Sequence, residues 1–166
     1  ALRKVTDLFG KRIVVLGAGG TARAALYGLL AEGGVPVVVN RTEKQGRGLA
    51  EEFGCPFYPL AEIGDLAGDI LINATPVGMV PEIDFSPVPA AALRRFRLVA
   101  DVIYNPMKTR LLREAEEAGC AVLSGMDMFV EQGAAQFRLW TGLEPPVDRM
   151  RQVVKQELER REGKQA

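Results

Sequence analysis

The amino-acid sequence predicts an α/β domain in three layers, with a doubly wound parallel β-sheet of about six strands between two layers of helices. Short apolar runs of strand length alternate with segments of helical periodicity along the whole chain. Segments of this length between strands favour crossover connections, which make neighbouring strands parallel. The first apolar run leads directly into a glycine-rich turn, and sheets that begin in this way have the strand order 3-2-1-4-5-6. The 166 residues suffice for one such domain with a full hydrophobic core, so a single domain is expected over residues 1–166.

Three strands and two helices are predicted in the first half of the chain, after a lead-in segment over residues 1–10. The strands are short apolar runs bounded by glycine or proline: Arg12–Leu16, Val35–Val39 and Cys55–Tyr58. The helices between them have apolar residues at helical spacing: Gly20–Ala31 and Glu43–Phe53. Gly33-Gly34 ends the first helix, and Pro36 is tolerated near the start of the second strand. The apolar face of the first helix is expected to comprise Ala24, Ala25, Leu26, Leu29 and Leu30.

The second half of the chain continues the alternation. Its predicted strands are Asp69–Asn73, Leu98–Ile103 and Cys120–Leu123. Its predicted helices are Lys108–Ala118, which Gly119 ends, and two closing helices, Asp127–Thr141 and Val147–Arg160. Residues 143–166 are therefore expected to form a charged C-terminal helix and a frayed tail, EGKQA.

Composition excludes several classes of protein. Lysine plus arginine and aspartate plus glutamate both number 21, and this balance argues against a nucleic-acid or anionic-membrane partner. No secretory signal and no apolar run of about 18 residues is present, which predicts a cytoplasmic protein. Histidine is absent, and the two cysteines lie far apart without CxxC spacing. Serine–histidine–aspartate and cysteine–histidine catalysis and most zinc sites are thereby excluded, and no metal is expected. The cysteines are interpreted as buried thiols of a reducing compartment.

The turn after the first strand has the pattern of a dinucleotide-binding loop of the Rossmann type. Gly17, Gly19 and Ala22 fit G-x-G-x-x-G/A, with a strand before the turn and a helix after it. Gly17 permits the sharp turn, and Gly19 lets the backbone approach a pyrophosphate. The N-terminus of the following helix then faces the negative charge of the ligand. A glycine turn without a ligand is the alternative.

The residues after the second strand indicate which dinucleotide is bound. NAD-binding versions of the motif carry a carboxylate there for the ribose 2′-hydroxyl. This chain instead has Asn40, Arg41 and Thr42, with Lys44 close behind. Arg41 offers a planar, charge-assisted fork to a 2′-phosphate, so the sequence favours NADP over NAD. Alternatively, Arg41 only caps a surface loop.

Five motifs together resemble the NADP-binding domain of shikimate dehydrogenase. They are GAGGTAR (17–23), NRT (40–42), INATPVGM (72–79), DVIYNPMKTRLL (101–112) and GMDMFVEQGAAQFRLWTG (125–142). The resemblance extends over almost the whole chain from about Gly10. It implies reversible, NADPH-dependent reduction of 3-dehydroshikimate to shikimate, with NADP(H) and these two compounds as partners.

The resemblance also implies roles for individual residues. The pyrophosphate would be held by Gly17, Ala18, Gly19, Gly20 and Thr21, and the 2′-phosphate by Asn40, Arg41 and Thr42 with support from Lys44. The nicotinamide half would lie near Thr75, Val102, Gly125 and Met128, and the substrate near Tyr104 and Gln132. Three of these residues also have a purely structural interpretation. Tyr104 is then an aromatic residue at the rim of the domain, Gln132 a solvated helix residue, and Met128 a side chain that fills the core. Two positions depart from the family pattern: Gln45 replaces a frequent basic residue, and Pro76 follows Thr75.

The family carries its catalytic lysine and aspartate on a separate N-terminal domain, which no segment of this chain matches. No catalytic residue is therefore assigned, and Asp101 and Lys108 are interpreted as parts of the DVIYNPMKT motif. The chain is expected to bind NADP(H) with little or no turnover. The side chains at the inter-domain edge, Met79, Val80, Tyr104 and Met126, are expected to be exposed and able to support a homodimer. A quinate/shikimate dehydrogenase, the dehydrogenase part of a fused dehydroquinate dehydratase–shikimate dehydrogenase, and an NADP-binding module without catalytic duty remain alternatives.

Overall fold

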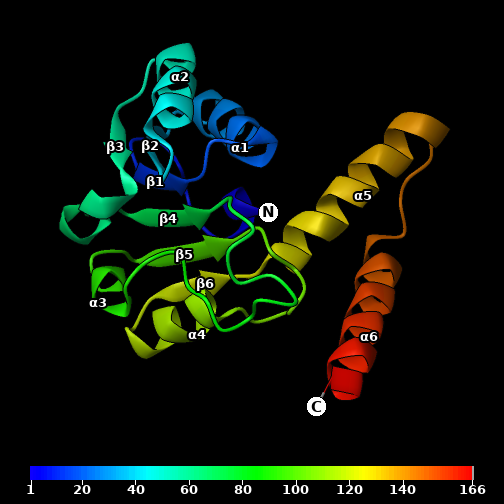
Figure 1. Ribbon diagram of the computed structural model, residues 1–166. Helices are drawn as coiled ribbons and strands as arrows, with labels where there is room; N and C mark the ends of the chain where they lie inside the picture. Colours follow the sequence, from blue (N-terminus) through cyan, green and yellow to red (C-terminus); the bar gives the residue numbers. More distant parts are fainter. Residues whose placement is uncertain (166) are drawn as a thin grey trace.

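A computed structural model describes the backbone of residues 1–165 and the side chains of residues 1–161. A parallel sheet of six strands forms its centre, in the order β3-β2-β1-β4-β5-β6 (Figure 1). The strands are β1 (Arg12–Leu16), β2 (Val35–Asn40), β3 (Phe57–Pro59), β4 (Ile70–Asn73), β5 (Leu98–Asp101) and β6 (Ala121–Leu123). The predicted doubly wound fold and its strand order are confirmed.

The register of the strands brings their carboxyl ends to one edge of the sheet. Leu16 at the end of β1 lies opposite both Val39 of β2 and Asn73 of β4, and Asn73 lies opposite Asp101 of β5. Between β1 and β4 the chain reverses its direction of winding across the sheet, and ligands bind at this kind of switch point. The loops that follow β1, β2, β4 and β5 therefore meet at one site.

Helices cover both faces of the sheet. The helical elements are η1 (Leu2–Lys4), α1 (Gly20–Ala31), α2 (Glu43–Phe53), η2 (Leu60–Asp65), α3 (Ala90–Leu93), α4 (Arg110–Glu117), α5 (Gly125–Thr141) and α6 (Val147–Gln165). Ile13 and Val15 of β1 belong to the cluster that includes side chains from α1 and α2. Val14 and Leu16 belong to the cluster on the other face, with η2, α3 and α4. Because strand side chains alternate between faces, the buried run of β1 supports both layers.

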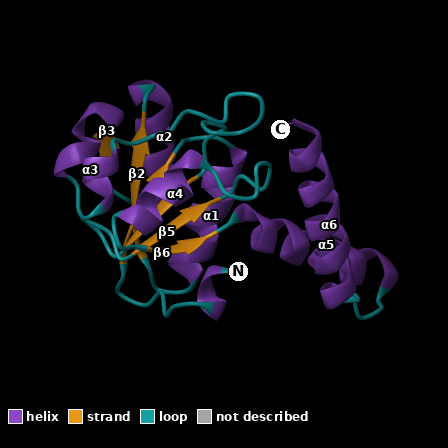
Figure 2. Ribbon diagram, turned by 90° about the horizontal axis from the view of Figure 1, so that it is seen from below, coloured by secondary structure: helices purple, strands orange, loops and turns teal. Residues whose placement is uncertain are grey.

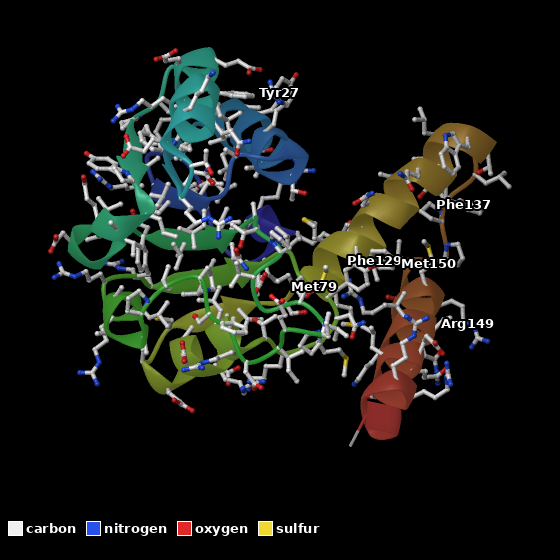
Figure 3. The ribbon with its side chains drawn as sticks, viewed as in Figure 1. Tyr27, Met79, Phe129, Phe137, Arg149 and Met150 are labelled. Carbon is white, nitrogen blue, oxygen red and sulfur yellow. The ribbon has the colours of Figure 1, made fainter. Side chains whose placement is uncertain are left out.

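The helices α5 and α6 extend away from the sheet and form an antiparallel pair (Figures 1 and 2). Arg151 of α6 forms ion pairs with Asp127 and Glu131 of α5, at 4.0 Å for the latter. Met150 of α6 lies against α5 near Gly133 (Figure 3). Within the described residues, no helix is long and apolar enough to span a lipid bilayer.

Capping residues move several predicted helix boundaries. The helix predicted from Asp127 begins at Gly125, because the Ser124 hydroxyl accepts a hydrogen bond from the Met126 N–H (3.2 Å). The helix predicted from Lys108 begins at Arg110, since Thr109 is its N-cap and accepts from the Leu112 N–H (3.4 Å).

Two further predictions about the helices were wrong in part. The last helix continues past Arg160 to Gln165, so most of the tail predicted to fray is helical, and Ala166 lies outside the described residues. Ion pairs of Glu157 with Arg160 and Arg161 support the last turns before the tail. On α1, Leu26 and Leu29 are buried as predicted, whereas Leu30 is 40% exposed. Ala24 is also exposed, because that side of α1 faces a cleft.

Candidate functional site

The glycine turn between β1 and α1 lies at the switch point of the sheet. Gly17 has φ +111°, and a Cβ atom at this position would lie 2.9 Å from the Ala74 carbonyl oxygen. Its N–H donates to the Val39 carbonyl oxygen (2.8 Å). Only glycine combines this backbone conformation with so close an approach of the β4 loop.

The first turn of α1 is open to a ligand. Gly19 is the N-cap and, like Gly20, would place a Cβ atom in open space, with no atom within 4 Å. No described side chain caps this helix, and its first turn contains no acidic residue. The partial positive charge of the helix N-terminus is therefore available to an anion, and a side chain at either glycine would fill the space next to it.

A first cleft, of about 560 Å³, lies on the β2 side of this turn. Its lining includes six of the predicted residues: Gly17, Ala18, Gly19, Asn40, Lys44 and Thr75. Arg41 and Thr42 lie beside it without lining it, and the Arg41 side chain is exposed. The Asn40 amide donates to the Thr42 carbonyl oxygen (2.9 Å), which fixes the turn that carries Arg41. Arg23 of α1, which was not among the predicted site residues, also lines the cleft.

A second cleft, of about 740 Å³, lies on the other side of α1 and reaches α5. It brings together five predicted residues: Gly20, Thr21, Val102, Met128 and Gln132. Much of its remaining lining is apolar and includes Ala24, Ala25, Leu29, Ile72 and Leu123. Thr75, expected near the nicotinamide half together with Val102, instead lines the first cleft.

Gly125 lines neither cleft but fixes the wall of the second. Its N–H donates to the Ile103 carbonyl oxygen (3.2 Å), and a Cβ atom would lie 2.3 Å from the Val102 carbonyl oxygen. The start of α5 is thus pressed against the backbone that follows β5, and this contact sets the position of Met128 and Gln132.

A buried polar network supports the loops behind both clefts. Asp101 accepts hydrogen bonds from the Asn73 amide (3.1 Å), the Ile103 N–H (3.0 Å) and the Thr109 hydroxyl (2.7 Å). Asn73 in turn accepts from the Thr75 hydroxyl (2.6 Å) and from its N–H (3.0 Å). Burial raises the pKa of Asp101 to about 6, although its three donors act in the opposite direction. The prediction that Asp101 is structural is consistent with this arrangement, whereas Asn73 and Thr109 were missed.

Exposed apolar side chains lie near the start of α5. Tyr104 stacks on Phe129 of α5, with ring centroids 4.3 Å apart, and does not line either cleft. Tyr104 is 39% exposed and Met79 47% exposed, as predicted for this edge. Val80 and Met126, predicted to be exposed with them, are instead half-buried. Figure 3 shows Met79 and Phe129 in the region between the sheet and the α5–α6 pair.

Comparison with known protein families gives two matches in successive parts of the chain. Residues 1–79 match the model of shikimate / quinate 5-dehydrogenase. Residues 125–155 match the model of the shikimate 5′-dehydrogenase C-terminal domain. The second match covers all of α5 and the first half of α6, and it contains none of the six strands.

Curated relatives agree with these matches. The chain is 46% identical over 154 residues to a shikimate dehydrogenase (NADP⁺) from Archaeoglobus fulgidus, which is 89% of this chain and 57% of the relative. It is 43% identical over 162 residues to the enzyme of the same name from Methanosarcina mazei, covering 92% of this chain and 58% of the relative. The chain thus spans somewhat more than half the length of the curated relatives that it matches.

Solved structures share the fold. A shikimate 5-dehydrogenase from Thermus thermophilus in complex with NADP(H) and shikimate superposes with a TM-score of 0.80 at 38% identity, over 89% of this chain and 55% of that one. A quinate dehydrogenase from Corynebacterium glutamicum in complex with NAD superposes with a TM-score of 0.81 at 32% identity, over 90% and 56% respectively. Sequence similarity of this extent, two family matches and the shared fold lead to one assignment. The chain belongs to the shikimate dehydrogenase family.

Proposed function

We propose that this chain binds NADP(H) and is the cofactor-binding part of an NADP-dependent shikimate dehydrogenase. The observation that carries the proposal is that two clefts meet at the N-terminus of α1. Gly19 lines one cleft and Gly20, the next residue, lines the other. A dinucleotide has two halves joined by a diphosphate, so a single molecule fits both clefts with its diphosphate over the open first turn.

The first cleft suits the adenosine half with its 2′-phosphate. Asn40 and Lys44 line it, and Arg41 stands on the turn beside it, so the end of β2 presents cations and an amide. Neither Asn40 nor its two successors is acidic, and no carboxylate there opposes a 2′-phosphate. Arg41 and Thr42 reach this phosphate from the rim, where their side chains are exposed.

The second cleft suits the nicotinamide half. When bound, the nicotinamide ring supplies or accepts the hydride. Val102 and Met128 provide an apolar surface for the ring and exclude water from it, while Gly125 holds the start of α5 against β5. Gln132 lines the cleft, and Tyr104 stacks on Phe129, the neighbour of Met128, so their polar groups are suited to hydroxyl or carboxylate groups of shikimate.

Acid–base catalysis is assigned to no residue of this chain. The Asp101 carboxyl group is buried and accepts three hydrogen bonds, so it is not free to take a proton from a substrate. Lys108 is exposed and paired with Glu116. A lysine–aspartate pair on a segment outside these 166 residues is proposed to move the proton, and the chain alone is expected to turn over little. A cytoplasmic location agrees with the two free thiols, Cys55 and Cys120.

Two related activities are weighed against this proposal. A quinate dehydrogenase is among the similar structures, and its name records a complex with NAD. The Asn40-Arg41-Thr42 sequence argues against NAD for this chain, because none of these three residues offers a carboxylate to a ribose 2′-hydroxyl. A shikimate dehydrogenase fused to a dehydroquinate dehydratase would differ from an unfused one only outside these 166 residues, so the proposed cofactor site is the same in both.

Calorimetric titration of the chain with NADPH and with NADH tests the proposal. NADPH is expected to bind more tightly, and Arg41→Ala is expected to weaken NADPH by about tenfold while leaving NADH within about twofold. Tighter binding of NADH would overturn the assignment of the first cleft. Addition of shikimate and NADP⁺ to the same chain is expected to produce little NADPH, and robust turnover would contradict the assignment of catalysis to another segment. Light scattering at the same concentrations tests the proposed homodimer through the Met79–Tyr104 edge.

A further inference from the structure

Arg23 occupies an unusual place for a residue of a cofactor cleft. It lies in the first turns of α1, directly after the glycine motif, and lines the first cleft with Asn40 and Lys44. Its guanidinium group forms an ion pair with Glu52 of α2, and Glu52 does not line the cleft. Arg23 therefore lines the ligand space, whereas its counter-ion Glu52 does not.

The charges around the first cleft make Arg23 significant. Two cationic side chains line the cleft, Arg23 and Lys44, and no acidic one does so among the described residues. Gln45 also lines the cleft, as a neutral group. Gly48 lines the cleft on α2, and a Cβ atom there would meet nothing within 4 Å, so no side chain at this position fills the space that Arg23 faces.

The ion pair between Arg23 and Glu52 is easily exchanged. The two side chains are 53% and 46% exposed, and ion pairs at such exposure contribute little net stability because water solvates both partners. A phosphate monoester carries close to two negative charges and accepts two parallel N–H donors from a guanidinium group. A phosphate in the cleft therefore competes well with the single Glu52 carboxylate.

We infer that Arg23 is a specificity-determining residue for the adenosine 2′-phosphate and that Glu52 holds its guanidinium group ready when the cleft contains no phosphate. The inference rests on the proposed function and deepens it, since it adds a cation of α1 to Arg41 and Lys44 at the 2′-phosphate. On ligand binding, Arg23 exchanges the carboxylate for the phosphate, while α1 and α2 keep their packing through Leu26, Leu49 and Ala50.

Three variants separate this role of Arg23 from three others: binding the diphosphate, neutralising Glu52, or forming only a surface ion pair. Arg23→Gln removes the cation, Glu52→Gln removes its competitor, and the double variant removes both. Arg47→Gln is the matched control, because Arg47 is an exposed arginine of α2 that pairs with Glu43 and does not line the cleft. Each variant is titrated by calorimetry with NADPH, NADH, 2′,5′-ADP and ADP, after its thermal midpoint confirms that it is folded.

Arg23→Gln is expected to weaken NADPH and 2′,5′-ADP by about tenfold and to change NADH and ADP by less than about twofold. Glu52→Gln is expected to strengthen NADPH by about threefold, because the phosphate no longer competes with a carboxylate. The double variant is expected to bind NADPH about as weakly as Arg23→Gln, and Arg47→Gln about as tightly as the unaltered chain.

Three results would overturn the inference. Equal losses for NADPH and NADH in Arg23→Gln would assign the residue to the diphosphate. Recovery of the original NADPH affinity in the double variant would mean that Arg23 only neutralises Glu52. Unchanged NADPH binding in Arg23→Gln would mean that Arg23 only forms a surface ion pair with Glu52. In each case the unaltered chain still prefers NADPH, whereas a chain that binds neither dinucleotide refutes the proposed function itself.

Discussion

Replacing Gly125 by alanine tests whether a backbone contact holds α5 against the sheet. The added Cβ atom would lie 2.3 Å from the Val102 carbonyl oxygen, 2.4 Å from the Val102 carbonyl carbon and 2.5 Å from the Ile103 carbonyl oxygen. All three are backbone atoms just after β5, so no rotamer change relieves the overlap. Either α5 or the strand end must move by about 1 Å to reach an ordinary contact.

The cost follows from what must move. Overpacking of a core typically costs about 1–3 kcal/mol, and here the obstacle is rigid backbone rather than a side chain. Gly125→Ala is therefore expected to lower the free energy of unfolding by about 3 kcal/mol. For a chain of this length, a loss of that size lowers Tm by about 9 °C. Urea and thermal unfolding followed by circular dichroism measure both values.

Gly133→Ala is the control on the same helix. A Cβ atom at Gly133 would approach only the Met150 Cε atom, at 3.2 Å, which is the flexible end of a side chain. The higher helix propensity of alanine offsets this contact, so stability is expected to change by less than about 1 kcal/mol. If Gly125→Ala unfolds at the same urea concentration as Gly133→Ala, the argument that α5 depends on this backbone approach is wrong.

Two further predictions concern charged groups. Burial raises the pKa of Asp101 from 3.8 to about 6, so its proton stabilises the fold below about pH 4 and this contribution is lost as the pH rises through about 6. The side chain of Asp101→Asn stays neutral at every pH. Between about pH 4 and 6, the free energy of unfolding of this variant should therefore fall by about 3 kcal/mol less than that of the unaltered chain. Equal dependence of the two unfolding free energies on pH would contradict the pKa argument. Arg151→Gln breaks the ion pairs of α6 with Asp127 and Glu131. It should cost less than about 1 kcal/mol globally yet speed amide exchange in α6, and exchange unchanged throughout α6 would mean that apolar packing alone holds it.

The fold was predictable because its signals are local. Each strand is a short apolar run, and the side chains of β1 are buried in a separate hydrophobic cluster on each face of the sheet. The glycine turn identifies the type of sheet, because Gly17 adopts a positive φ that other residues rarely adopt. Boundaries were less predictable, since Ser124 and Thr109 act as N-caps only once the chain has reached the right geometry.

The positions of the candidate site residues were predictable where the backbone sets them and less so for long side chains. The glycines of the turn and Val102 lie where their motifs indicate. Arg23 was not predicted to line the first cleft, because its pairing with Glu52, 29 residues away, is not visible in the sequence. Thr75 lies in the first cleft because Asn73 fixes its loop through two hydrogen bonds, a contact that spacing alone does not reveal.

The two kinds of residue at this site have different consequences when they change. Asn73, Asp101 and Thr109 are buried and hold the loops behind both clefts, so altering any one of them leaves unpaired polar groups in the interior. Arg23 and Arg41 are exposed, and altering them removes charge with little loss of packing. Weaker cofactor binding therefore means different things at the two sets of positions. Weaker binding by a variant reports a lost contact with the ligand only when the free energy of unfolding of that variant is unchanged. Each binding measurement on Arg23 or Arg41 variants therefore needs an unfolding curve of the same variant.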